Sequence, residues 1–326
     1  MSERAPRQEA SPWLPSHPGG SVITVGTFDG VHRGHWAVLR EVRRLAEESG
    51  ARPVVVTFET HPLRVIRPGV APRLLTTAEE KKELLAESGV GYAVFLAFTA
   101  ELAAYSPRRF VEEILMGRLG LRHLVIGHDH GLGRGRTGDA ATLQALGEAL
   151  GFEVEVVPAV QLDGEPLSST RIRNALEAGD VEFATRALGR PYSISGVVVR
   201  GEAQGRALGF PTANVQVPDP DKLLPREGIY AVRASFGGEE REGVLHLGPR
   251  PTFEGFAPSI EVHLFDFEGE LYGERMRVDF CRRLREIRRF ESMSELAEAI
   301  REDCEAARRY FAESRAACGP RSDELM

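Results

Sequence analysis

The chain has 326 residues, of which 42% are hydrophobic and 27% charged, and a formal net charge of −7 at pH 7. This is the composition of an ordinary soluble globular protein, and the length favours two domains because a single core rarely grows beyond ~250–300 residues. The acidic balance argues against a dedicated nucleic-acid binder, and no apolar stretch reaches the ~18 residues that span a bilayer. Three cysteines without metal-ligand spacing suit a reducing cytoplasm.

Residues 1–19 are polar and rich in proline, lack the apolar segment of a secretory signal, and are expected to form a loose tail. From residue 20 to residue 184, short apolar runs alternate with amphipathic stretches. Near-continuous apolar strands separated by helices predict an α/β domain with a doubly wound parallel sheet of Rossmann-like type, covered on both faces. The predicted strands are residues 21–25, 53–58, 92–98, 123–127 and 153–160.

The pattern changes in residues 185–315, where alternating segments rich in valine are joined by turns that contain glycine and proline. Such a pattern predicts a small antiparallel β-barrel. An amphipathic stretch at residues 294–313 predicts one long C-terminal helix, and residues 316–326 are expected to form a second tail. The predicted strands of this domain are residues 192–201, 228–238, 241–248, 259–267 and 275–280.

A turn with two histidines, GTFDGVHRGH (26–35), follows the first predicted strand. Ligands of open parallel sheets bind beyond the carboxyl ends of the strands. Gly26 and Gly30 let backbone approach a ligand closely, and the helix that begins next points its positive end at the same space. Phosphate suits such a place, and His32 and His35 would then stabilise charge on a phosphate as it is displaced. The simpler alternative is that both histidines only cap the helix or lie on the surface.

Two other patterns suggest different chemistry. GRGRTG (133–138) matches the GxGxxG pattern and predicts an NAD-dependent oxidoreductase. It follows the fourth strand rather than the first, however, and its arginines would crowd a pyrophosphate. HDH (128–130) directs two histidines to one side of an extended segment, as metal ligands would be, but no third ligand stands at a suitable spacing. Both remain minor alternatives.

The second candidate site lies in GRALGFPTANV (205–215), whose glycines could form a flexible flap over phosphates. Thr212 and Asn214 are two residues apart, so in an extended segment their oxygens point to one side and suit Mg²⁺ bound with a nucleotide. On a later predicted strand, Glu261 shares a face with His263, and a carboxylate there could accept a hydroxyl proton during phosphoryl transfer. The alternatives are a polar turn and a solvent-facing strand.

Taken in order, these motifs resemble the bacterial bifunctional riboflavin kinase/FAD synthetase family. The segment His32-Arg33-Gly34-His35 is similar to the HxGH signature of nucleotidyltransferases, and SSTRIR (168–173) is similar to their second ATP-phosphate motif. The resemblance spans roughly residues 21–310. It also includes TFETHP (57–62), GHDHGLGRGRTGD (127–139), GIYAV (228–232), RPTF (250–253) and SIEVHLFDFEGELYG (259–273).

The resemblance implies an N-terminal FMN adenylyltransferase domain and a C-terminal riboflavin kinase barrel, with Mg²⁺ as cofactor and ATP, riboflavin and FMN as substrates. It implies that His32 and His35 stabilise the adenylyl-transfer transition state and that Glu261 activates the riboflavin 5′-hydroxyl. We expect small-molecule partners, neither nucleic acid nor a membrane, and a monomer or weak homo-oligomer. The other implied contacts are with ATP (Gly26, Phe28, Asp29, Ser169, Thr170, Arg173, Gly205, Arg206, Gly209), flavin (His61, Pro62, Asp129) and Mg²⁺ (Thr212, Asn214).

The sequence departs from the family pattern at three places. The usual Asp-Phe-Arg-Phe-Gly is DHGLG here (129–133), His246 stands where asparagine is usual, and Ile287 stands where an acidic residue is common. None of them is a proposed catalytic residue, but they leave flavin affinity and the relative rates open. A kinase with a degenerate adenylyltransferase half, or a non-catalytic flavin-binding protein, are the alternatives that follow.

Overall fold

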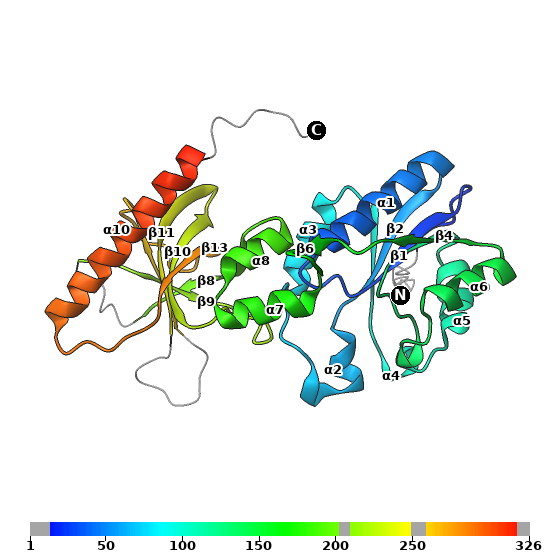
Figure 1. Ribbon diagram of the computed structural model, residues 1–326, viewed down its shortest axis with the longest axis horizontal. Coiled ribbons are helices and arrows are strands. Elements are labelled where there is room, and N and C mark those ends of the chain that lie inside the picture. Colours follow the sequence, from blue (N-terminus) through cyan, green and yellow to red (C-terminus); the bar gives the residue numbers. More distant parts are fainter. Residues whose placement is uncertain (1–13, 202–208, 249–258, 318–326) are drawn as a thin grey trace, which may run out of the picture. The chain divides into compact units, whose positions relative to one another are not determined.

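The computed structural model describes residues 14–201, 209–248 and 259–317, and the chain divides into two compact units, Met1–Ser169 and Thr170–Met326 (Figure 1). The first unit contains a five-stranded sheet in the order β3-β2-β1-β4-β5, with every pair parallel. This arrangement confirms the predicted α/β fold and brings the carboxyl ends of all five strands to one edge. The strands are β1 (Ser21–Val25), β2 (Arg52–Phe58), β3 (Tyr92–Leu96), β4 (Leu121–Gly127) and β5 (Glu153–Val157).

Helices cover both faces of this sheet because neighbouring residues of a strand point to opposite sides. Val22 packs in a core with α1 and α3, whereas Ile23 packs in a second core that includes Phe110 and Leu143. The helices of the unit are α1 (Arg33–Ser49), α2 (Pro62–Ile66), η1 (Pro68–Val70), α3 (Ala78–Glu87), α4 (Ala100–Ala103), α5 (Pro107–Phe110), the π-helix η2 (Val111–Met116), η3 (Arg134–Arg136) and α6 (Ala140–Leu150). A short hairpin pairs β6 (Gln161–Leu162) with β7 (Glu165–Pro166).

The last residues of the predicted N-terminal tail contact the first unit. Leu14 packs against the core that contains Ile23, and Arg52 donates a hydrogen bond to the carbonyl oxygen of Pro15 at 2.7 Å. An apolar side chain and a buried guanidinium therefore hold residues 14–19 to the first unit. The sequence pattern missed these contacts because they depend on residues distant in the chain.

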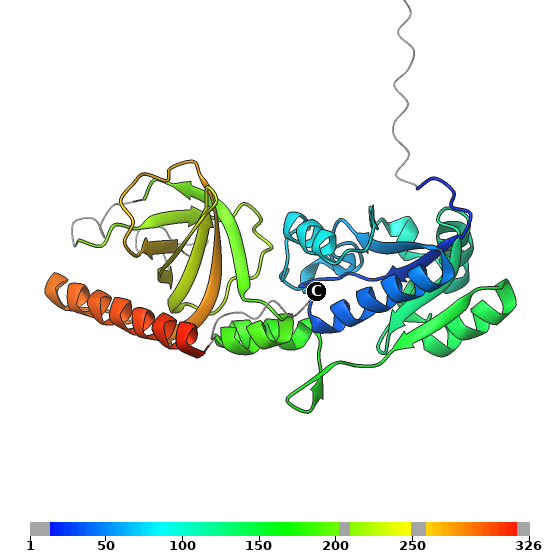
Figure 2. The same ribbon diagram turned by 90° about the horizontal axis from the view of Figure 1, so that it is seen from above.

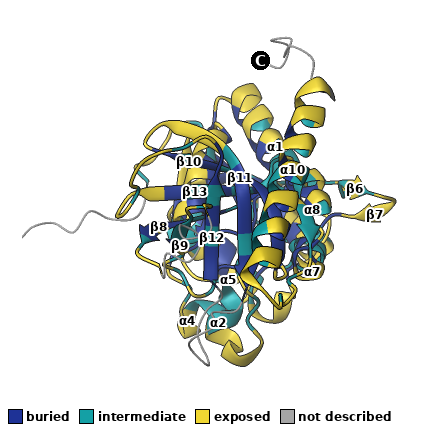
Figure 3. Cartoon of the chain, turned by 90° about the vertical axis from the view of Figure 1, so that its left-hand side faces the viewer, coloured by how far each residue is buried: buried dark blue, intermediate teal, exposed yellow. Residues whose placement is uncertain are grey.

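The second unit contains a closed antiparallel barrel in the order β10-β11-β12-β9-β8-β13, as the alternating segments predict. Figure 3 shows that its strands are largely buried, whereas the helices carry exposed faces. The predicted C-terminal helix is confirmed as α10 (Met293–Ala317), which lies along the outside of the barrel (Figures 1 and 2). The strands are β8 (Tyr192–Val199), β9 (Ala213–Gln216), β10 (Gly228–Phe236), β11 (Glu239–Gly248), β12 (Ser259–Leu264) and β13 (Arg275–Arg285).

Two helices, α7 (Ser169–Ala178) and α8 (Val181–Leu188), precede the barrel. Within the second unit, α8 contacts β13 and β8, and the backbone amide of Arg226 donates to the carbonyl oxygen of Leu176 at 2.8 Å. The division between the units falls after Ser169, the first residue of α7, whereas the sequence pattern places it near residue 184. Helical periodicity continues through this region, so the sequence pattern does not show to which unit α7 and α8 belong. Only their packing shows this.

Candidate functional site

The turn after β1 has a strained backbone. Phe28 and Val31 have φ angles of 48° and 38°, values that side chains other than glycine rarely adopt, and Gly30 between them has φ 82°. Each such non-glycine residue costs about 1–3 kcal/mol, so surrounding contacts must hold the conformation. Strain of this kind is common where a protein positions reactive groups.

The side chain of Asp29 supplies the main contacts that hold this turn. Its carboxylate, which is almost fully buried, accepts hydrogen bonds from the backbone amides of Leu75 (3.1 Å) and Thr76 (3.0 Å) and from the Thr76 hydroxyl (3.2 Å). The Thr76 hydroxyl also accepts from the amide of Gly30 at 3.0 Å, and the Ser169 hydroxyl donates to the carbonyl oxygen of Asp29 at 2.9 Å. Hydrogen bonds to a charged group contribute about 1.5–3 kcal/mol each, enough to offset the strain.

His32 and His35 cap α1 reciprocally. The Nδ1 of His32 accepts from the amide of His35 at 3.4 Å, and the Nδ1 of His35 accepts from the amide of His32 at 3.3 Å. The two rings are stacked with centroids 3.7 Å apart, and Gly34 leaves room for the His32 ring, whose atoms lie 3.1 Å from where a Cβ would stand. A neutral ring whose Nδ1 accepts carries its proton on Nε2. Capping therefore fixes both Nε2 atoms as donors.

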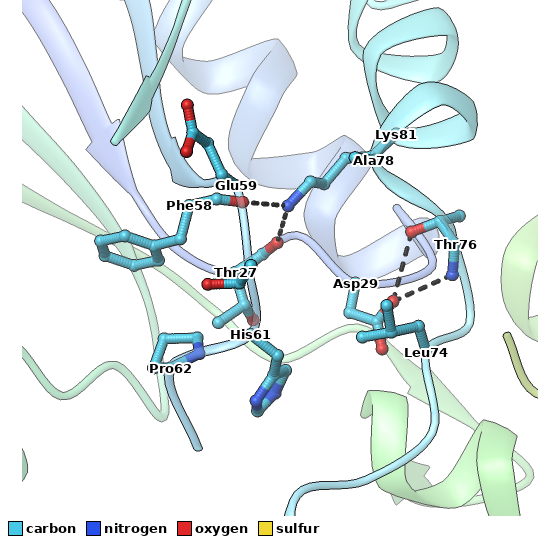
Figure 4. Close-up of a pocket in the computed structure, with 11 residues that line it drawn as sticks. Thr27, Asp29, Phe58, Glu59, His61, Pro62, Leu74, Thr76, Ala78 and Lys81 are labelled. Atoms are coloured by element: carbon cyan, nitrogen blue, oxygen red, sulfur yellow. Dashed lines mark hydrogen bonds between the residues drawn. The ribbon is translucent and has the colours of Figure 1, made fainter. Parts of the chain in front are cut away.

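A pocket opens beside this turn, between the ends of β1 and β2 and the start of α3 (Figure 4). It brings together Asp29, His61 and Pro62, three of the residues that the sequence selects. His61 caps α2 by accepting from the amide of Leu63 at 3.2 Å. The pocket is lined by Thr27, Asp29, Phe58, Glu59, Thr60, His61, Pro62, Leu74, Thr76, Ala78 and Lys81.

Lys81 is a residue of this pocket that the sequence analysis missed. Its ammonium donates to the carbonyl oxygens of Phe58 (2.7 Å) and Thr27 (3.2 Å) and to the hydroxyl of Thr57 (3.3 Å). Burial lowers the pKa of Lys81 from 10.5 to about 8, against an opposing effect of the Asp29 carboxylate. A usable signal existed, because Lys81 stands three and four positions before two apolar residues of α3 and so lies on its buried face.

The other predicted residues of this half are placed as follows. Gly26 directly follows β1, and its amide donates to the carbonyl oxygen of Val56 at 3.0 Å. Phe28 is buried, with its ring centroid 5.1 Å from that of His35. Asp129 follows β4 with an exposed side chain and is not part of the pocket lining. Thr170 and Arg173 lie on the first turns of α7, in residues that belong to the second unit.

The GRGRTG segment does not form a dinucleotide-binding turn. Its last glycine, Gly138, pairs with Leu132 to close a compact loop, and α6 begins only at Ala140, with Asp139 as its N-cap. The carboxylate of Asp139 caps that helix by accepting from the amide of Thr142 at 2.9 Å, so negative charge already stands at the positive end where a pyrophosphate would bind. The oxidoreductase alternative is therefore not supported.

The HDH segment does not form a metal centre either. Desolvation and the nearby Arg136 lower the pKa of His130 to about 4, while His128 lies 3.9 Å from the carboxylate of Asp129. Among the residues that the structure describes, no group of three histidine, cysteine, aspartate or glutamate side chains could hold a metal ion. Arg136 instead fills space in this loop. A Cβ at Gly131 would lie 2.7 Å from its Cβ, and its guanidinium donates to the carbonyl oxygen of Asp129 at 2.6 Å.

In the barrel, three neighbouring strands place polar residues in one row. Glu261 on β12 stands opposite Asn214 on β9 and opposite His246 on β11. Its carboxylate accepts from Ser259 at 3.0 Å and from Thr212 at 3.4 Å. The predicted residues Thr212, Asn214 and Glu261 are thus gathered at one place, where a hydroxyl, an amide and a carboxylate supply the hard oxygen atoms that Mg²⁺ prefers.

Two departures from the family pattern lie next to each other in this barrel. A Cβ at Gly248 would lie 2.9 Å from the ring of His246 and 2.4 Å from the Cδ1 of Ile287. Burial lowers the pKa of His246, so its ring is neutral at pH 7. Among the predicted flap residues, Gly209 is exposed with φ 83°, and Gly205 and Arg206 lie outside the described residues.

Comparison with known proteins agrees with this geometry. A family model for FAD synthetase matches residues 14–171, and one for riboflavin kinase matches residues 188–311. The bifunctional riboflavin kinase/FMN adenylyltransferase of Pseudomonas fluorescens is 43% identical over 301 residues, covering 92% of this chain and 96% of the relative. The chain belongs to this bifunctional family. The protein of the same name from Escherichia coli K12 is 38% identical, with 90% and 93% of the two chains covered.

A solved structure is also similar. The crystal structure of a protein named as a macrolide-efflux protein from Streptococcus pneumoniae superposes with a TM-score of 0.81 at 29% identity, covering 90% of this chain and 95% of that chain. Within the described part of our chain, no helix is both long and apolar enough to cross a membrane.

Gly201 leaves the space in which the Asn214 side chain lies. A Cβ at position 201 would stand 2.2 Å from Nδ2 and 2.7 Å from Oδ1 of Asn214. We expect Gly201→Ala to displace this amide, and a ¹⁵N correlation spectrum would show its side-chain resonances shifted. Gly91→Ala is the control, because a Cβ there meets only Pro53 at 4.0 Å. Unchanged Asn214 resonances in Gly201→Ala would contradict the assigned geometry.

Proposed function

We propose that this chain makes flavin cofactors with two ATP-dependent activities. The second unit phosphorylates riboflavin to FMN, and the first unit transfers AMP from ATP to FMN, giving FAD and pyrophosphate. The observation that carries the proposal is the pair of capping histidines at the positive end of α1, beside a pocket at the carboxyl ends of β1 and β2. Family membership over both units supports the assignment of the two reactions.

In the first unit, adenylyl transfer joins an oxygen of the FMN phosphate to the α-phosphorus of ATP and breaks the bond to pyrophosphate. The Nε2 donors of His32 and His35 stabilise the charge that develops on the phosphate oxygens, with the positive end of α1 adding to their field. No covalent bond to the enzyme is needed, so the residues act by positioning and charge. The ATP contacts would come from Gly26, Phe28, Asp29, Ser169, Thr170 and Arg173, and the flavin contacts from His61, Pro62 and Asp129.

In the second unit, Glu261 accepts the proton of the riboflavin 5′-hydroxyl as that oxygen bonds to the γ-phosphorus of ATP and ADP leaves. The hydrogen bonds from Ser259 and Thr212 orient the carboxylate. Thr212 and Asn214 are the residues that would hold Mg²⁺, which when bound neutralises phosphate charge. Gly209, with Gly205 and Arg206, would cover the nucleotide.

The same proposal includes the partners, the cellular location and the oligomeric state of the enzyme. Its partners are the small molecules ATP, riboflavin and FMN, without nucleic acid or a membrane, and it works in the cytoplasm as a monomer or weak homo-oligomer. The acidic net charge of −7 supports the absence of nucleic acid.

One incubation of the purified chain with riboflavin, ATP and Mg²⁺, followed by chromatography of the flavins, tests both activities. FMN followed by FAD is expected. If riboflavin gives FMN but no FAD, and FMN supplied as substrate also gives no FAD, the adenylyltransferase half is degenerate. The absence of any product from the folded protein would reject the proposal.

His35→Ala should slow FAD formation by about 100-fold, the scale expected when one charge-stabilising donor is lost. Riboflavin phosphorylation by the same sample serves as the internal control and should be unchanged. Because His35 also caps α1, His35→Gln is the matched variant, since glutamine at this position can still reach back to the amide of His32. Full FAD synthesis by His35→Gln would mean that the imidazole acts only as a cap.

Glu261→Ala should abolish FMN production, because the riboflavin hydroxyl loses its proton acceptor, while conversion of supplied FMN to FAD continues. Initial rates of the two half-reactions, measured separately, check this. Glu270→Ala, which removes an exposed carboxylate of the same unit, is the control and should retain both activities. Loss of both activities in a folded Glu261→Ala protein would argue against two independent sites.

A further inference from the structure

Lys81 is buried with all three donors of its ammonium group hydrogen-bonded. Only 8% of its surface is exposed, yet it stands at the edge of the candidate pocket (Figure 4). An ammonium has three N–H donors, and here three acceptors receive them, from Thr27, Thr57 and Phe58. Two of these acceptors belong to the last two residues of β2, and the third lies in the turn after β1. Lys81 therefore joins the carboxyl ends of two neighbouring strands.

The contact with Thr27 leads directly to the paired histidines. Thr27 precedes Phe28, the first residue of the turn with a positive φ, and the Phe28 ring packs against that of His35. Asp29 holds the far side of the same turn through the amides of Leu75 and Thr76. Lys81 and Asp29 thus secure the strained segment from its two ends. A shift at Thr27 would be passed to the imidazole that the turn positions.

We propose that Lys81, as an ammonium ion, is a positioning residue for adenylyl transfer, and that it acts by holding the turn after β1 in the conformation that directs His32 and His35. This inference rests on the proposed FMN adenylyltransferase activity of the first unit. It assigns Lys81 no contact with the reacting atoms.

Deprotonation of the Lys81 ammonium would weaken its hold on the turn after β1. A neutral amine has two donors and a lone pair, so one of the three acceptors loses its hydrogen bond. The pKa of Lys81, about 8, lies within a range that kinetics can reach. The charged and titratable groups around it are Asp29 from the turn, Glu59 and His61 after β2, and Glu80 and Lys82 on α3, while the Phe95 ring of β3 lies 5.7 Å from its nitrogen.

Loss of this proton is not expected to unfold the chain. The folded pKa of Lys81, about 8, is below the ordinary value of 10.5, so between these values the unfolded state binds the proton more tightly. This group alone therefore makes stability rise with pH over that window. A loss of activity above pH 8 would run in the opposite direction to its effect on stability, which separates positioning from folding.

The test measures FAD formation from FMN and ATP in the wild-type chain and in Lys81→Met, Lys81→Arg and Lys82→Met. Lys82 is the matched control because it is the adjacent, exposed lysine. We expect kcat of Lys81→Met to fall ~10–100-fold with KM values changed less than ~3-fold, because a misplaced donor weakens the transition state more than substrate binding. Lys82→Met and riboflavin phosphorylation in every variant should be unchanged.

The pH profile provides the second readout. Wild-type kcat should fall with increasing pH above pH 8 and level off near or above the value for Lys81→Met, while circular dichroism shows the fold intact. In Lys81→Arg, which retains charge at all these pH values, this alkaline decrease should be absent even if the rate is lower.

Three results would overturn the inference. These are an unchanged kcat in folded Lys81→Met, a loss confined to the KM of ATP or FMN, and an alkaline decrease that persists in Lys81→Arg. If Lys81→Met does not fold, the profile of Lys81→Arg decides. Failure of the wild-type chain to form FAD would instead reject the proposed function, and the inference with it.

Discussion

The first unit depends on a turn that cannot hold its own conformation. Phe28 and Val31 adopt backbone angles that are unfavourable for residues with a Cβ. The contacts that stabilise this turn come from residues that lie 46, 47 and 140 positions further along the chain. The conformation of the turn, and with it the placement of the paired histidines, therefore depends on Leu75 and Thr76, which precede α3, and on Ser169, the first residue of α7.

Features that depend on neighbouring residues are predictable from the sequence. An apolar run followed by glycine and histidine predicts the end of β1 and the start of α1 at Arg33, and both are confirmed. The parallel sheet, the barrel and α10 likewise follow from local periodicity. The helical spacing of Lys81 with Leu84 and Leu85 indicates the buried face of α3, but its role does not follow from the sequence because its three acceptors stand 23, 24 and 54 positions away.

Helix capping by His32 and His35 does not prevent the same rings from donating hydrogen bonds to a ligand. From the sequence alone, helix capping and phosphate binding are alternative roles for His32 and His35. In the structure both rings cap α1 through Nδ1, and this use of one nitrogen fixes the proton on the other. In the barrel, the spacing of Thr212 and Asn214 predicts a shared side, but their approach to Glu261 depends on the pairing of β9 with β12. The nearness of His246 to Ile287 requires the closed barrel and lies beyond any local pattern.

The loop after β4 changes the meaning of one departure from the family pattern. Gly131 stands where an arginine is usual, but the side chain of Arg136 lies against its Cα and fills the volume into which a side chain at 131 would project. A side chain larger than glycine at position 131 would have to displace Arg136. The residues at these two positions are therefore sterically coupled, and a change at one is expected to need a change at the other.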